Sequence, residues 1–105
     1  MELHRDFFIF WDSYGAWYDP EPPAHLDNDG LGFRVPLLII SPYAKQGHVS
    51  HVHYEHCSIL KFTENRFGLP RLTSCDTRAN SPDDAFDFSQ SPRKFVPIKG
   101  LYDAH

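Results

Sequence analysis

Long hydrophobic runs, basic clusters and cysteine motifs are all scarce in this sequence. No apolar stretch approaches the length that crosses a bilayer, and the N-terminus lacks the layout of a signal peptide. The 10 Lys and Arg residues are scattered and the net charge is −4, which argues against nucleic-acid binding. Cys57 and Cys75 have no CxxC spacing, so neither a disulfide framework nor a zinc site is expected, and the compartment stays open.

The composition fits one small and incomplete domain. The chain has 105 residues, of which 41% are hydrophobic and 15% aromatic, enough for a core, but it also has nine prolines and long stretches without periodicity. We expect two buried strands and one helix, too few for a parallel sheet covered on both faces. Residues 1–105 are therefore expected to be a piece of a larger α/β domain.

Two apolar runs predict strands. Residues 7–11 are aromatic and branched, and residues 35–40 are almost continuously apolar until Ser41-Pro42 ends the run. Neither run has a polar side to offer water, which is typical of strands buried on both faces of a parallel sheet. We expect them to be neighbours.

A helix is predicted over residues 56–67. Ile59, Leu60, Thr63 and Phe67 recur at helical spacing, so this face is expected to pack on the strands. Gly68 and Pro70 form a usual stop signal. Strand, polar loop and helix make half of a βα unit, in which ligands lie beyond the carboxyl end of the strand.

The polar residues after each strand are the candidate functional groups. Asp12 directly follows the first run, where it could serve chemistry or simply cap a turn. Four histidines follow the second run, and imidazoles bind metals or exchange protons near neutral pH. Helical geometry lets at most two of them point inward, and a solvated loop with one histidine capping the helix is an equal alternative; the four are His48, His51, His53 and His56.

The remaining segments predict turns and extended chain. Residues 27–30 (Asp-Asn-Asp-Gly) favour a tight turn, because a calcium loop in this register would place its last ligand on Pro36. Residues 71–82 are polar and turn-rich, and Ser81 with Pro82 can begin a short helical turn. Residues 91–105 are expected to form an extended tail.

Several motifs in the same order resemble the bacterial phosphoesterase family, which includes phospholipases C and acid phosphatases related to the alkaline-phosphatase-like superfamily. The matching residues are 11–19 (WDSYGAWYD), 32–36 (GFRVP) through 41–42, 50–51 with 54–56 (YEH) and 58–62 (SILKF), and 85–90 (AFDFSQ). The resemblance covers nearly the whole chain but only the C-terminal part of the family. It implies part of a three-layer sandwich with a mostly parallel sheet.

The resemblance also implies roles for particular residues. Asp12 and His51 fall on metal-ligand positions, and His51 and His56 on catalytic positions, of a hydrolase that acts on phosphoric esters with a divalent metal ion. The chain departs from the pattern at Ser13, where a second acidic residue is usual, and at Pro20, where histidine is usual. A non-catalytic remnant or interaction module is therefore the alternative. The substrate would be a phosphate ester or phospholipid, and the nucleophile and remaining ligands would lie in an N-terminal part not included here. Members of this family are often secreted or periplasmic.

These considerations lead to one geometric expectation. Adjacent parallel strands present their carboxyl ends at the same edge of a sheet, about 5 Å apart. Asp12 and His51 are therefore expected to converge on one ion or phosphate there. With Ser13 in place of a carboxylate, metal binding by this chain alone should be weak.

Overall fold

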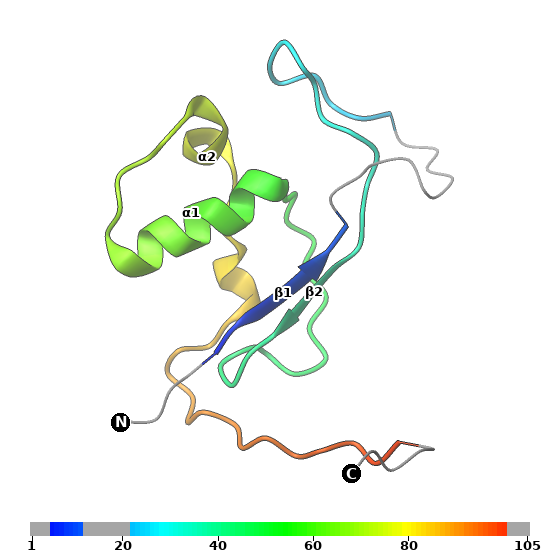
Figure 1. Cartoon of the computed structure of the whole chain (residues 1–105), viewed down its shortest axis with the longest axis vertical. Helices are drawn as coiled ribbons and strands as arrows, with labels where there is room; N and C mark the ends of the chain where they lie inside the picture. The colour runs from blue at the N-terminus through cyan, green and yellow to red at the C-terminus, as the bar shows by residue number, and fades with distance from the viewer. Residues whose placement is uncertain (1–4, 12–21, 101–105) are drawn as a thin grey trace.

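The computed structural model describes residues 5–11 and 22–100. The elements follow in the order β1 (Phe7–Phe10), β2 (Leu37–Ile40), α1 (His56–Phe67), α2 (Ser74–Arg78) and the short 3-10 helix η1 (Pro82–Ala85). The strands lie side by side, the three helical elements lie on one side of them, and the segment after η1 runs away at one end (Figure 1). None of the helices in these residues is long and apolar enough to span a membrane.

The two strands are neighbours, as expected, but they run antiparallel. Phe7 pairs with Ile40 and Phe10 with Leu37, so β2 begins beside the end of β1. The expectation of a parallel pair is therefore wrong. A parallel partner needs a crossover across the sheet, usually a helix, and the proline-containing connection has no helix within its described part, residues 22–36. The chain instead returns to the end of β1 from which it left.

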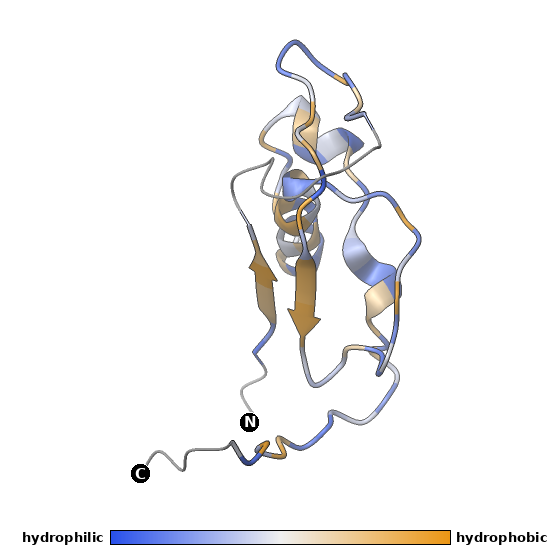
Figure 2. Ribbon diagram, turned by 90° about the vertical axis from the view of Figure 1, so that its right-hand side faces the viewer, coloured by the Kyte–Doolittle hydropathy of each residue, from blue (hydrophilic) through white to orange (hydrophobic). Residues whose placement is uncertain are grey.

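One face of the sheet is partly covered, with Phe10 and Leu37 still 41% and 37% exposed, and the other face is open. Alternation along antiparallel strands puts Phe8, Phe10, Leu37 and Ile39 on the same face. The Phe8 ring lies 5.5 Å from the Phe62 ring of α1, so this face packs on the helix. The other face is apolar but exposed, with exposures of 53% at Phe7, 46% at Ile9, 56% at Leu38 and 49% at Ile40. Burial on both faces is thus not seen, although both strands are strongly hydrophobic (Figure 2).

The bounds of α1 agree with the sequence-based expectation. The helix ends at Gly68, whose φ of 64° is the left-handed conformation that favours glycine. The expected packing face is only partly right, because Phe67 is 75% exposed whereas Phe62 is buried. The Phe62 ring stacks on Phe86 at 4.7 Å, and Phe86 also lies 6.3 Å from Phe8. These three rings form the centre of a small core.

A second helix and a disulfide were not expected from the sequence. In the segment predicted to contain only turns, α2 is capped by Thr73, whose side chain accepts from Cys75 N, while Asp76 accepts from Thr73 N. Cys57 in α1 and Cys75 in α2 are joined by a disulfide, with Cα atoms 5.9 Å apart. The sequence spacing of 18 residues carries no motif. The cysteines meet because the two helices pack with their first turns together.

The loops follow the sequence expectations in part. Asp27 Oδ1 accepts from the N–H groups of Asp29 and Gly30, which gives the predicted tight turn. Pro82 begins the predicted helical turn, but Ser81 makes no side-chain capping bond. After η1 the chain pairs with the loop behind β2, since Lys45 N donates to Ala85 O and Asp87 N to Tyr43 O, both at 2.8 Å. Residues 91–100 form no helix or strand, and residues 101–105 lie outside the described part.

Candidate functional site

His56 is the predicted site residue with the clearest placement. It is the first residue of α1, and its Nε2 lies 2.9 Å from the carbonyl oxygen of Trp11. A carbonyl only accepts, so Nε2 carries the proton and Nδ1 keeps a lone pair whenever the ring is neutral. The ring also meets Phe10 edge-on at 5.3 Å. His56 is thus held at the carboxyl end of β1 with one nitrogen available for proton exchange or ligation.

Asp12 lies outside the described residues, and its side chain is not placed here. Its neighbour Trp11 is described and accepts the bond from His56. The loop after β2 therefore returns the chain to the end of β1, immediately before the predicted metal ligand. The expected parallel strands do not bring these two segments together, because the strands are antiparallel. The His56–Trp11 bond connects the segments instead.

His51 is an exposed residue of the loop between β2 and α1. The argument that it meets Asp12 relied on parallel strands, whose carboxyl ends share one sheet edge. In the observed pair the carboxyl end of β2, Ile40, lies opposite Phe7 at the start of β1. Convergence of Asp12 and His51 thus loses its geometric basis and stays a prediction from the family resemblance alone.

A polar cluster in the same loop was not anticipated as a unit. Asp84 of η1 accepts hydrogen bonds from Ser50 Oγ at 2.5 Å and from the Tyr54 hydroxyl, and its Oδ2 lies 3.3 Å from His48 Nε2. The Ser50 and Tyr54 oxygens lie 2.9 Å apart. Burial acts to raise the pKa of Asp84, but the bonds from Ser50 and His48 and the charge of Lys45 outweigh it and lower the pKa. A carboxylate is thereby kept ionised beside the loop.

The sequence contained only half of the signal for this cluster. Ser50 and Tyr54 stand in the motif quoted for the family resemblance, whereas Asp84 follows the Ser81-Pro82 turn signal and was not singled out. The partners of Asp84 are 30 to 36 positions away, and no spacing rule connects them. Only the pairing of residues 43–45 with 85–87 brings η1 to the loop.

An open cleft of about 360 Å³ lies beside the cluster. Apolar residues of β2 and polar residues of the following loop line it. An apolar lining with a few polar groups is typical of small-molecule sites. The lining residues are Leu37, Leu38, Ile39, Ala44, Lys45, His48, Val49, Ser50, Tyr54 and Ala85.

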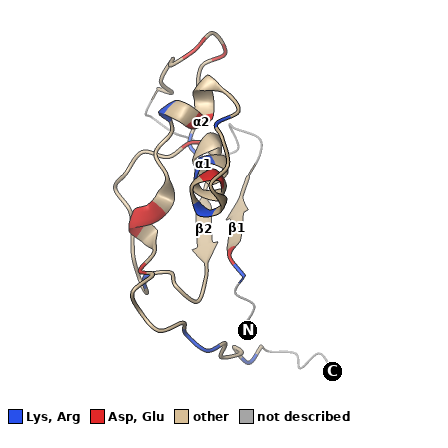
Figure 3. Ribbon diagram, turned by 90° about the vertical axis from the view of Figure 1, so that its left-hand side faces the viewer, with Lys and Arg blue, Asp and Glu red and all other residues tan. Residues whose placement is uncertain are grey.

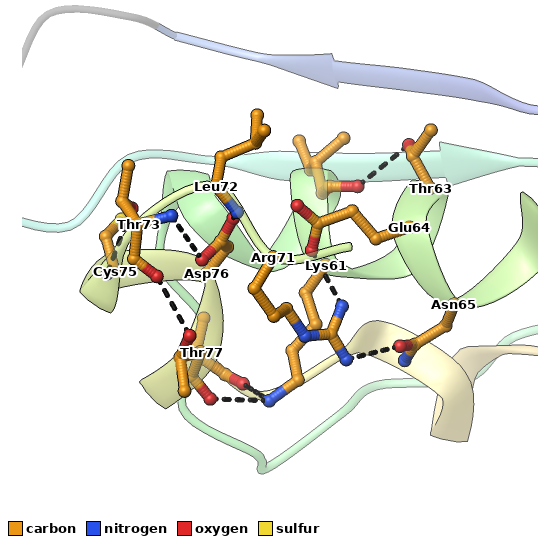
Figure 4. Close-up of polar contacts among 12 residues, drawn as sticks. Lys61, Thr63, Glu64, Asn65, Arg71, Leu72, Thr73, Cys75, Asp76 and Thr77 are labelled. Atoms are coloured by element: carbon orange, nitrogen blue, oxygen red, sulfur yellow. Dashed lines mark hydrogen bonds and ion pairs between the residues drawn. The ribbon is translucent and has the colours of Figure 1, made fainter. Parts of the chain in front are cut away.

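Two buried carboxylates of the helical unit serve its structure. Asp76 has no exposed surface and accepts from Leu72 N at 2.7 Å and Thr73 N at 3.1 Å. Glu64 is 2% exposed and pairs with Arg71 at 2.7 Å, while Arg71 also donates to Asn65 (Figure 4). Each fixes the backbone between α1 and α2, and neither faces the cleft.

The described residues contain one group of three potential metal ligands, and it does not include His51. Its ligand atoms, from Glu55, Cys57 and Cys75, lie within 4.8 Å of one another. The two sulfurs are bonded to each other, so the thiolates that a metal requires are absent in this state. The predicted set of Asp12 with His51 has its first member outside the described residues, so its fit to a metal rests on the family pattern.

Known proteins share sequence with most of this chain. The profile of the Phosphoesterase family matches residues 4–70. Phospholipase C B of Mycobacterium tuberculosis is 39% identical over 71 residues, which cover 65% of this chain and 14% of the relative. Hemolytic phospholipase C of Pseudomonas aeruginosa is 55% identical over 40 residues, 38% of this chain and 6% of that protein.

A plant relative extends the match along the chain. Non-specific phospholipase C1 of Arabidopsis thaliana is 31% identical over 117 aligned positions, which cover 87% of this chain and 22% of the relative. The chain therefore spans less than a quarter of the length of each of these relatives.

Proposed function

Because the chain belongs to the phosphoesterase family, we propose that it is the C-terminal portion of an enzyme that hydrolyses phosphoric esters. The observation that carries this proposal is the family match over residues 4–70, which contains all the predicted site residues. The relatives carry the name phospholipase C, which favours a phospholipid or another phosphate diester as the substrate class. The nucleophile would come from a part of the enzyme N-terminal to residues 1–105.

We assign His56 the role of proton donor to the leaving oxygen. Its Nε2 is engaged by the Trp11 carbonyl, so the ring is oriented and Nδ1 is the nitrogen that exchanges the proton. Asp12 and His51 would hold a divalent metal ion, and His51 would also contact the phosphoryl group. Such an ion, when bound, neutralises charge that develops on phosphoryl oxygens. The orientation of His56 supports this assignment.

The wider fold is part of the same proposal. The antiparallel pair with helices over one face would be a segment of the alkaline-phosphatase-like sandwich, and the rest of the enzyme would cover the open face. Four apolar side chains exposed by 46–56% on that face support this.

The test is a chimera in which residues 4–70 replace the matching segment of the mycobacterial relative. Hydrolysis of a phosphatidylcholine analogue and of a generic phosphate diester should be retained and should be lost on chelation of divalent metals. His56→Ala, His51→Ala and Asp12→Asn should each lower kcat by about 10²-fold or more. His53→Ala, at an exposed loop histidine, is the matched control and should leave kcat unchanged.

The alternative, a non-catalytic remnant, has its own outcome. If the chimera folds but remains inactive, and Ser13→Asp with Pro20→His restores activity, the departures from the family pattern have abolished catalysis. Unchanged rates in His56→Ala would contradict the role assigned to that residue.

A further inference from the structure

We propose that Glu55, Cys57 and Cys75 bind a soft divalent cation such as Zn²⁺ once the disulfide is reduced. The three side chains come from the first turns of α1 and α2 and offer one carboxylate and two sulfurs within 4.8 Å of one another. Tetrahedral coordination with Zn–S bonds of about 2.3 Å separates two sulfurs by roughly 3.8 Å. All three residues are half-buried. A reductant and a metal ion can therefore reach a site that needs only a small expansion.

Glu55 is held in place independently of the disulfide. It is the N-cap of α1, where its backbone carbonyl accepts from Ser58 N at 2.8 Å and its own N–H donates to Ser58 Oγ. Arg78 of α2 donates to both carboxylate oxygens, through Nε at 3.1 Å and Nη2 at 2.9 Å. The backbone of Glu55 is thus fixed by α1 and its carboxylate by α2, beside the sulfurs.

The two helices also stay together without the disulfide. Lys61 of α1 donates to the carbonyl oxygens of Thr77 at 2.9 Å and Ala79 at 2.7 Å, at the far end of α2 (Figure 4). Together with the Glu55–Arg78 pair, these bonds hold the C-terminal end of α2 against α1. Reduction therefore opens one of several links, and the two thiols remain neighbours in the folded chain.

The disulfide and the metal-bound form are two mutually exclusive states of this site. Two electrons and two protons convert the disulfide into two thiols; two thiol molecules of the reductant supply them and become a disulfide. Zn²⁺ then displaces both thiol protons and is held by two sulfurs, one carboxylate oxygen and a water molecule. Because the same sulfurs make the covalent bond or the metal bonds, oxidation expels the ion. Arg78 competes for Glu55, but it keeps Asp27 as a second partner at 2.8 Å.

The experiment uses the full 105-residue chain and Co²⁺ as a spectroscopic substitute for Zn²⁺. A phosphine reduces the disulfide without adding thiols, because it takes an oxygen from water and becomes a phosphine oxide. The reduced protein should bind one Co²⁺ per chain with a thiolate-to-cobalt charge-transfer band, and Zn²⁺ should displace it. The oxidised protein should show no band. Absence of the band after reduction would overturn the proposal.

Variants separate a folded site from two thiols on a flexible chain. Glu55→Gln should weaken Co²⁺ binding by about tenfold or more, since a neutral amide is a poorer ligand than a carboxylate. Asp29→Asn, the matched control, neutralises an exposed carboxylate that is not one of the three ligands, and should not weaken binding. Cys75→Ser should abolish the charge-transfer band of two thiolates. Equal affinity in wild type and Glu55→Gln would overturn the three-ligand site.

Discussion

The helical unit and the sheet of this chain are stabilised in very different ways. Between α1 and α2 there are a disulfide, the Glu55–Arg78 pair and the bonds of Lys61 to two carbonyls. The strands contain no charged residue (Figure 3). They contact the rest through one face, while the other face is exposed. The helical unit is therefore held by a covalent bond and specific charged contacts, whereas the sheet depends on apolar cover that the described residues supply mainly on one side.

The largest effect should come from breaking the strongest link of the helical unit. Cys75→Ser removes a disulfide that closes a loop of 18 residues, worth about 3 kcal/mol in a chain-entropy account. We expect a loss of this order in the free energy of unfolding, measured by urea denaturation with helix circular dichroism. Cys57→Ser should give the same loss, because both remove one covalent link. A loss below about 1 kcal/mol in both would mean that noncovalent contacts alone hold α2 in place.

The next prediction compares the two sheet faces directly. Phe8→Ala removes the ring that contacts Phe62 and Phe86 and should lower the free energy of unfolding by about 2 kcal/mol. Ile9→Thr changes the next residue of β1, which lies on the open face and is 46% exposed. This substitution should lower the free energy of unfolding by less than about 0.5 kcal/mol. It should also reduce binding of a hydrophobic dye. Equal losses in the two variants would show that both faces are covered in solution.

The sequence predicted features whose signals lie within a few residues better than it predicted contacts between residues far apart in the chain. The bounds of α1 followed from apolar spacing and the Gly68 stop. The α2 helix was missed although Thr73 and Asp76 make a capping-box pattern that is readable in sequence. The disulfide, the Asp84 cluster and the antiparallel pairing join residues far apart, and no spacing rule encodes them. His56 was one of four candidate histidines from its place in the sequence, and only the family resemblance suggested a catalytic role for it.

The next prediction concerns how the stability of the helical unit depends on pH through the Asp76 carboxylate. Burial acts to raise the pKa of Asp76, but the hydrogen bonds donated by Leu72 N and Thr73 N act against it, and the pKa lies below its usual value. A depressed folded-state pKa gives stability that is present above about pH 4 and lost as the pH falls through the folded-state pKa. Asp76→Asn should therefore lower the thermal midpoint by several degrees at pH 7. The difference from wild type should shrink below about pH 4, as measured by thermal denaturation across pH, and a constant difference would contradict a titrating Asp76.

The smallest expected effect concerns the outer side of α1. The Arg66 guanidinium lies 4.3 Å from the centre of the Phe88 ring. Cation–π contacts at exposed positions contribute about 0.5 kcal/mol. Arg66→Gln should cost about this much in urea denaturation, while Arg66→Lys should retain part of it. A loss above about 1.5 kcal/mol would mean that Arg66 has a structural role beyond this contact.

The antiparallel register has a consequence for any larger assembly of strands. In the described part of the chain, β1 and β2 pair only with each other, so each strand presents one outer edge of N–H and C=O groups to further strands. A strand added beside β1 and parallel to it is necessarily antiparallel to β2. Likewise, a strand added beside β2 and parallel to it is antiparallel to β1. No sheet that incorporates this pair can be wholly parallel, because strand direction reverses between β1 and β2.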